Sequence, residues 1–152
     1  MKLYPIRPLS NFEIEDYCNK HGLPLNACFS KDHLDDTPMK NGDCYVLNLD
    51  TADGNGSHWT CLMKNKGIVL YYDPFGVEPP ESVLAKIKNT KGRCYYSQEV
   101  NQDLDSVLCG YYCLSILKSV FRENMTFRQY LAKLYNYPNK KNKKFIMNNL
   151  KN

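Results

Sequence analysis

Cys109 is the residue of this chain best placed to act as a nucleophile. It stands with Gly110 in the stretch QDLDSVLCGYYCLSIL, residues 102–117, where an apolar helix is predicted to begin. Asp105 or Ser106 could cap that helix, and the free N–H groups and positive dipole end of its first turn would favour a thiolate. Gly110 would leave room for a substrate backbone. The alternative for Cys109 is core packing, because free cysteine is among the most buried residue types.

His58 and Asp73 are candidates for a general base and the acid that orients it. Residues 58–64 and 67–73 both have the composition of strands, and residues 65–66 would form a two-residue turn between them. Counting outward from that turn places His58 directly opposite Asp73, with their Cβ atoms about 5 Å apart. The carboxylate would then fix the imidazole tautomer and stabilise the imidazolium. A bulge at Gly67 would slip this register, and a surface ion pair at the end of the sheet is the alternative.

A metal site is the main rival explanation for histidine and cysteine in one fold. His58 and Cys61 are three residues apart on one predicted strand, so their side chains would point to opposite faces. The chain also contains no CxxC pair, which is a common spacing in structural zinc sites. The pattern therefore favours a thiol nucleophile over a zinc site.

The elements that must position these residues are predicted to form one α+β domain over residues 1–152. With 43% hydrophobic residues, the chain can bury a sizeable core. A helix is expected from Ser10, which has capping-box spacing to Glu13, as far as Gly22, and an irregular stretch follows over 23–43. The other predicted elements are strands over 44–49, 58–64, 67–73 and 93–100 and helices over 79–89, 109–121 and 126–134, with Cys113 in the core and a Thr126–Gln129 cap.

Composition indicates an intracellular protein with reduced thiols. The N-terminal segment MKLYPIRPLSNFE lacks the uninterrupted apolar run of a secretory signal, and no stretch is long and apolar enough to cross a bilayer. The seven cysteines are an odd number, which favours free thiols over a disulfide framework. We therefore expect no membrane contact and a thiol available for chemistry.

Lysines concentrate in a predicted C-terminal tail that starts at about residue 136. Clustered lysines gain affinity for nucleic acid by releasing its counterions, so a DNA-binding tail is one interpretation. Charge runs at chain ends are common, however, and this one has no interleaved arginine, so a solvated terminus is the favoured interpretation. The net charge is +4, and the last thirteen residues contain Lys140, Lys141, Lys143, Lys144 and Lys151.

Four short motifs follow one another in a fixed order. They are GSHW at 56–59, YYDPFG at 71–76, Gln102, and CG at 109–110, with the glutamine seven residues before the cysteine. This set resembles the adenovirus-type cysteine proteases, the adenain-like group of clan CE that also includes the ubiquitin-like-protein deconjugases. The stretch FSKDHL at 29–34 further resembles the compact proteases encoded by virophages and Polinton/Maverick-like elements. The resemblance covers about residues 16–121.

The resemblance implies a papain-related α+β core, with a central, mostly antiparallel sheet flanked by helices and site residues in the order His-Asp-Gln-Cys. It implies Cys109 as the nucleophile and His58 as general base and then general acid. Asp73, which stands where adenoviral enzymes carry Glu, would orient His58. Gln102, otherwise an ordinary polar loop residue, would donate its side-chain amide to the oxyanion together with the backbone N–H of Cys109. Trp59 would either shield the site from water or be a structural tryptophan.

The same resemblance implies peptide hydrolysis through a thioester, with cleavage after small residues at Gly-Gly-X-like sites in capsid or other virion precursors. The expected locations are the viral factory in the host cytoplasm and the virion. The expected partners are these protein substrates and, through the lysine-rich tail, DNA. The sequence requires no cofactor, whereas the family implies activation by a viral peptide or by DNA.

Three functions of other classes remain as alternatives. A ubiquitin-like-protein deconjugase would use the same residues but needs a docking surface for a folded partner, for which 152 residues leave little room. An acetyltransferase of the related effector type would transfer an acyl group from acetyl-CoA. A non-catalytic, basic DNA-packaging protein would not need Cys109 at all.

Overall fold

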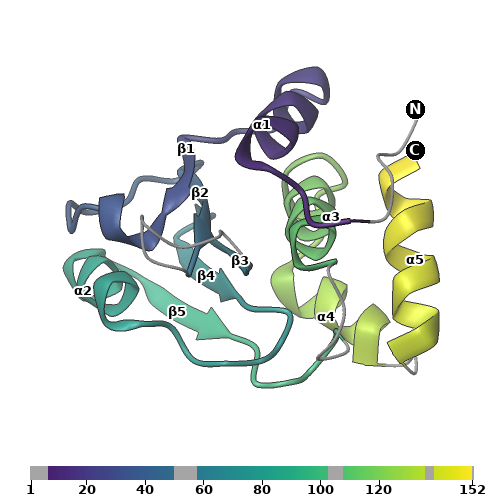
Figure 1. Ribbon diagram of the computed structural model, residues 1–152. Helices are drawn as coiled ribbons and strands as arrows, with labels where there is room; N and C mark the ends of the chain where they lie inside the picture. Colours follow the sequence, from purple (N-terminus) through teal and green to yellow (C-terminus); the bar gives the residue numbers. More distant parts are fainter. Residues whose placement is uncertain (1–6, 50–57, 103–107, 136–138, 152) are drawn as a thin grey trace.

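A five-stranded mixed sheet forms the centre of the computed structural model, which describes residues 7–49, 58–102, 108–135 and 139–151. The strands lie in chain order across the sheet (Figure 1). The two inner pairs, β2–β3 and β3–β4, are antiparallel, and the two outer pairs are parallel. The bounds are β1 Ala27–Ser30, β2 Cys44–Asn48, β3 Trp59–Asn65, β4 Ile68–Tyr72 and β5 Arg93–Tyr96.

Helices cover the two faces of the sheet unequally (Figure 1). Successive residues of β3 alternate between faces, so Cys61 and Met63 belong to the larger apolar core and Leu62 to the smaller one. This arrangement confirms the predicted α+β class, with a sheet flanked by helices, although the sheet is evenly mixed where a mostly antiparallel one was expected. The larger core includes residues of α1 (Asn11–Lys20), α3 (Cys109–Phe121), α4 (Phe127–Tyr135) and α5 (Asn139–Lys151), and the smaller core includes residues of α2 (Glu81–Asn89). The short 3-10 helix η1 (Lys31–His33) contacts α2.

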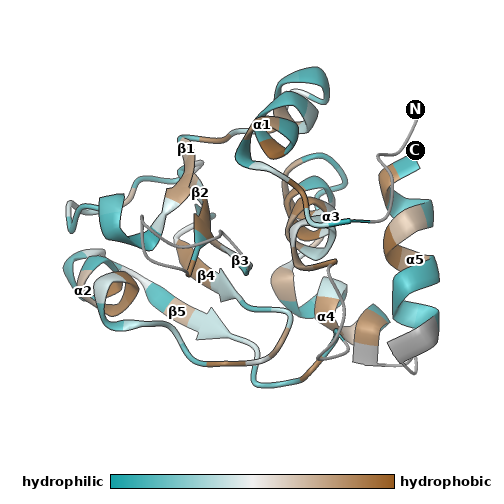
Figure 2. Cartoon of the chain, in the orientation of Figure 1, coloured by the Kyte–Doolittle hydropathy of each residue, from teal (hydrophilic) through white to brown (hydrophobic). Residues whose placement is uncertain are grey.

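The α3 helix is buried over nearly its whole length. Every residue from Cys109 to Val120 is buried, and brown apolar colour extends over much of the helix in Figure 2. It contacts α1, α4, α5 and β3, and a helix enclosed on several sides needs apolar residues around most of its circumference. The start of α3 is thereby held against β3. Within the described residues, no helix combines the length and apolar character required to traverse a bilayer.

The turn between β3 and β4 differs from the predicted one. Asn65 pairs with Ile68, so the turn residues are Lys66 and Gly67, both with positive φ (51° and 79°). Two positive φ values are characteristic of a type I′ hairpin turn. The predicted turn at 65–66 is therefore wrong by one residue, and the predicted pairing of His58 directly opposite Asp73 is wrong by two residues. A shift of two residues keeps every side chain on its original face, because the side-chain repeat of a strand is two.

Two helix starts agree with the sequence prediction. Ser10 and Glu13 bond each other's backbone N–H groups at the start of α1, forming a capping box. Thr126 and Gln129 make the same reciprocal pair before α4, at 2.9 and 3.0 Å. These local signals were readable because a capping box needs only residues three apart in sequence.

Other segments differ from expectation. The stretch 23–43, predicted to be irregular, contains β1 and η1, and β5 ends at Tyr96 instead of residue 100. The lysine-rich C-terminal segment is not a solvated terminus: it forms α5, which buries Ile146 and Leu150 against the larger core. The lysines at 141, 143 and 144 are exposed on the same helix.

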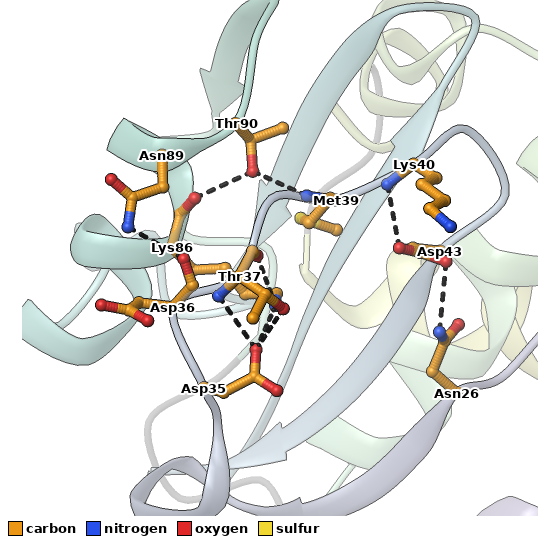
Figure 3. A network of polar contacts seen from close by, with 10 residues as sticks. All are labelled: Asn26, Asp35, Asp36, Thr37, Met39, Lys40, Asp43, Lys86, Asn89 and Thr90. Atoms are coloured by element: carbon orange, nitrogen blue, oxygen red, sulfur yellow. Dashed lines mark hydrogen bonds and ion pairs between the residues drawn. The ribbon is translucent and has the colours of Figure 1, made fainter.

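Lys86 ties α2 to the segment that precedes β2 (Figure 3). Its side chain is 1% exposed, and its ammonium donates to a carboxylate oxygen of Asp35 at 2.9 Å and to the carbonyl of Thr37 at 2.8 Å. The Thr90 hydroxyl accepts from the Met39 N–H at 3.0 Å nearby. Hydrogen bonding to Lys86, followed by bonding to Thr37, holds the pKa of the exposed Asp35 carboxyl well below its usual range. These bonds hold residues 35–39 over the smaller core.

We predict that Lys86→Ala lowers the free energy of unfolding by about 1.5–3 kcal/mol, because charged hydrogen bonds to Asp35 and Thr37 are lost. Lys88→Ala is the matched control, since Lys88 is an exposed lysine of the same helix and surface substitutions usually stay within about 0.5 kcal/mol. Urea unfolding of both variants measures the difference. Equal stability of the two variants would contradict a stabilising role for Lys86.

Candidate active site

Cys109 is the first residue of α3, as the sequence predicts. The preceding residue, Leu108, occupies the N-cap position without a side-chain cap, and the predicted caps Asp105 and Ser106 lie outside the described residues. The first turn of a helix has unpaired N–H groups and the positive end of the helix dipole, which stabilise negative charge. The backbone N–H of Trp59 also donates to the Cys109 sulfur at 3.3 Å. The side chain is 3% exposed, so the thiol lies in a nearly dry environment.

His58 immediately precedes β3, and Asp73 immediately follows β4. The His58 Nε2 atom lies 2.8 Å from the Asp73 Oδ1 atom. Continuing the observed β3–β4 register outward places Thr60 opposite Asp73 and His58 opposite Phe75, so the His58–Asp73 contact is a diagonal one within the reach of longer side chains. The structure thus brings together the two residues that the sequence paired, through a different register.

Phe75 supports both members of this pair, a contribution that the sequence analysis missed. Its ring stacks on the imidazole of His58 with centroids 4.6 Å apart, and its backbone N–H donates to Asp73 Oδ1 at 2.8 Å. The same carboxylate oxygen therefore accepts from His58 and from Phe75. The signal was present in the YYDPFG motif, but only the corrected register shows which side chain faces the imidazole.

His58 also interacts electrostatically with the Cys109 thiol, and its buried Nδ1 atom makes no hydrogen bond within the described residues. Burial lowers the pKa of the imidazole, but its interactions with Asp73 and with Cys109 outweigh this effect and raise the pKa to about 9. Because Asp73 holds Nε2, Nδ1 is the ring nitrogen that remains for proton exchange with the thiol. An acid, an imidazole and a thiol are therefore grouped in that order, an arrangement that can activate a sulfur nucleophile.

Trp59 and Gly110 pack together beneath the thiol. Trp59 is buried, and its indole N–H donates to the Leu9 carbonyl at 2.8 Å. A Cβ atom on Gly110 would lie 3.2 Å from Leu9 and 3.3 Å from Trp59. The space that Gly110 leaves is therefore filled by Leu9 and Trp59 of the protein itself, and not kept open for a substrate as the sequence suggested. Trp59 is a structural tryptophan whose backbone also reaches the sulfur.

Gln102 lies beside the loop that follows Asp73. Gln102 is fully buried, and its backbone N–H donates to the Pro74 carbonyl at 3.2 Å. The preceding residue, Asn101, donates to the same carbonyl at 2.9 Å. Gln102 is thus anchored to the residue that follows the acid, whereas residues 103–107, between Gln102 and the helix of Cys109, lie outside the description.

The remaining cysteines have the environments of packing residues. Burial raises the pKa of Cys18 to about 12 and also raises the pKa of Cys94 and of Cys113. Cys113 is buried one turn after Cys109, as expected for a core residue. In the described part of the chain, no group of three or more His, Cys, Asp or Glu side chains is arranged to hold a metal ion.

Comparisons with known proteins bear on the fold. No family model matches the sequence, and no curated protein does. The structure is similar to the crystal structure of the ASFV pS273R protease, with a TM-score of 0.58 and 17% identity over 80% of this chain and 60% of that one. A selenomethionine crystal structure of the same protease aligns with a TM-score of 0.44 and 21% identity, over 57% of this chain and 36% of that one. The first likeness shows that this chain has the fold of that viral protease. The chain spans about three-fifths of the length of that protease.

We predict that iodoacetamide at neutral pH modifies Cys109 faster than Cys94, although Cys94 is the more exposed. The reason is that His58 can take the thiol proton of Cys109, and the thiolate is the reactive form. Peptide mapping by mass spectrometry after short exposure measures both rates. His58→Ala should slow Cys109 by about tenfold or more while leaving Cys94 unchanged. A Cys109 rate that is insensitive to this substitution would contradict the assignment.

We also predict a pH-dependent contribution of His58 to stability. Its pKa in the folded chain, about 9, lies above the ordinary value of 6.5, so the folded state holds the proton more tightly. The stabilisation is therefore complete below pH 6.5 and is lost as the pH rises through about 9. Urea unfolding of wild type and His58→Gln across this range measures it. The difference between the two proteins should shrink with rising pH, and a constant or growing difference would refute the prediction.

Proposed function

We propose that this chain is a viral cysteine endopeptidase. The observation that carries the proposal is the grouping of Asp73, His58 and Cys109: Asp73 and His58 are 2.8 Å apart, and His58 interacts electrostatically with the thiol at the N-terminus of a buried helix. The fold shared with the ASFV pS273R protease is consistent with it. The motif resemblance supplies the finer assignment, to the adenain-like proteases of virophages and Polinton-like elements.

In the proposed reaction, His58 takes the proton of the Cys109 thiol, and the sulfur attacks the carbonyl carbon of the scissile peptide bond. The tetrahedral intermediate collapses as the carbon–nitrogen bond breaks, and the imidazolium gives its proton to the leaving amine. A water molecule, deprotonated by His58, then attacks the thioester and releases the acid product and the thiol. Asp73 holds the ring and stabilises the imidazolium in both halves.

Two donors are assigned to the oxyanion of each tetrahedral intermediate. The first is the backbone N–H of Cys109, in the first turn of α3, and the second is the side-chain amide of Gln102. Loss of one such donor costs about 3 kcal/mol of barrier in related chemistry. The anchoring of Gln102 beside the Asp73 loop supports this role, because it fixes the residue close to the acid.

The proposed substrates are capsid or other virion precursors, cut after small residues at Gly-Gly-X-like sites. The proposed setting is the viral factory in the host cytoplasm and the assembling virion. A viral peptide or DNA is a proposed activator by family analogy, and the exposed lysines of α5 at 141, 143 and 144 offer a surface for DNA phosphates.

We predict that wild-type protein cleaves a Gly-Gly-X capsid precursor and that Cys109→Ser does not. Electrophoresis and mass spectrometry of the products measure cleavage. Cys94→Ser is the matched control and should cleave like wild type, because Cys94 lies on β5, apart from the assigned residues. His58→Ala should lower kcat by several orders of magnitude, since it removes the base. Full activity in Cys109→Ser or in His58→Ala would overturn the proposal.

The same assay separates the alternatives when substrates are compared. A deconjugase would prefer a ubiquitin-like fusion over the Gly-Gly-X precursor. An acetyltransferase would transfer labelled acetyl groups from acetyl-CoA and cut neither substrate. A DNA-packaging protein would bind DNA and show no thiol-dependent cleavage.

A further inference from the structure

Asn101 is a buried polar centre next to Gln102. The residue is 2% exposed, yet it takes part in four hydrogen bonds with separate parts of the fold. Its side-chain oxygen accepts from the Tyr72 hydroxyl at 2.9 Å, and its N–H donates to the Pro74 carbonyl at 2.9 Å. Its own carbonyl accepts from the Tyr112 hydroxyl at 3.0 Å and from the Asn142 side-chain amide at 3.1 Å. A surface loop would not need so many buried partners.

The four partners come from elements that surround the candidate site. Tyr72 ends β4 directly before Asp73, Pro74 follows Asp73, and Tyr112 lies in the first turn of α3 after Cys109. Asn142 belongs to α5 and is 1% exposed. Asn101 therefore links the acid's strand, the nucleophile's helix and the C-terminal helix within one residue of Gln102.

We propose that α5 is a positioning element of the active site, in which Asn142 and Tyr112 hold the Asn101 carbonyl and thereby fix the side chain of Gln102. This inference rests on the proposed function, because it assigns a role to the oxyanion donor of that reaction. Asn142 and Tyr112 touch no reacting atom and act only through Asn101.

The physical basis is the cost of a buried carbonyl without its donors. With one donor removed, the Asn101 carbonyl is left undersatisfied in a dry environment, which favours loop conformations that turn it elsewhere. Because Gln102 is the next residue, its amide would move with that change. Small misplacements of a catalytic group cost turnover steeply, whereas they affect substrate binding much less.

The rest of α5 docks independently of Asn101. The Tyr17 hydroxyl donates to the Leu150 carbonyl at 3.3 Å, and Ser115 donates to Asn149 at 2.8 Å. Lys118 also donates to the Asn149 carbonyl. Removing the Asn142 amide therefore leaves these contacts of α5 with α1 and α3 in place, so positioning can be tested separately from docking.

The test compares Asn142→Leu and Tyr112→Phe with wild type for kcat and KM on a Gly-Gly-X peptide and for the alkylation rate of Cys109. We expect kcat to fall by about tenfold with KM within about twofold of wild type. Alkylation by iodoacetamide should be unchanged, because that reaction forms no oxyanion. Tyr17→Phe is the matched control: it removes another buried hydroxyl bond to α5 and should leave kcat unchanged.

A double-mutant cycle with Gln102→Ala completes the test. If Asn142 acts through Gln102, Asn142→Leu has little further effect on kcat once Gln102 is alanine. Equal effects of Asn142→Leu on kcat with and without the Gln102 side chain would overturn the inference. Unchanged kcat in Tyr112→Phe, the second variant to use if Asn142→Leu fails to fold, would overturn it too. If the wild type still cleaves the peptide, either outcome leaves the proposed function intact, whereas absence of thiol-dependent cleavage by the wild type removes the proposed function and this inference together.

Discussion

The meeting of the start of α3 with the start of β3 is the constraint on which the candidate site depends. Cys109 is the first residue of a helix that is enclosed by other elements. Trp59 is the first residue of β3, and its backbone N–H donates to the Cys109 sulfur at 3.3 Å. Gly110 permits this approach, because a side chain there would meet Leu9 and Trp59 at 3.2 and 3.3 Å. Because His58 directly precedes Trp59, fixing these two chain segments also holds the backbone of His58 near the sulfur. The position of the base relative to the sulfur is thus a consequence of core packing.

The polar residues around the site are buried and therefore need hydrogen-bond partners within the protein. Asp73, Asn101 and Gln102 are each 2% exposed or less, and a buried polar group without partners is costly. Asn101 meets this demand with bonds that join distant segments, from β4 to α5, and both Asn101 and Gln102 donate their backbone N–H to the Pro74 carbonyl. At Asn101, the bonds that satisfy buried polar groups are thus the ones that align the site, whereas the buried Asp73 Oδ2 atom has no hydrogen-bond partner among the described residues.

The sequence predicted what depends on nearby residues and on strand periodicity. The capping boxes of α1 and α4, the helix start at Cys109 and the common face of His58 and Asp73 were all readable, and the last survived a register error because that error was two residues. The α5 helix was not predicted. Its five lysines dominate the sequence pattern, and its apolar face consists of few residues, among them Ile146 and Leu150. The contributions of Phe75, Leu9 and Asn101 depend on tertiary contacts that no local pattern encodes.

The charges of the site are met by backbone donors. The Asp73 carboxylate receives the Phe75 N–H, and the Cys109 sulfur receives the Trp59 N–H at the positive end of a helix dipole. Backbone donors are fixed in direction by the fold, so they need no reorganisation when the sulfur gains or loses charge. His58 then lies between a carboxyl group and a thiol that each receive a backbone N–H of their own. A site of this kind depends on the path of the chain at β3, at the Phe75 turn and at Asn101, and therefore on helices such as α5 that contribute no reacting group.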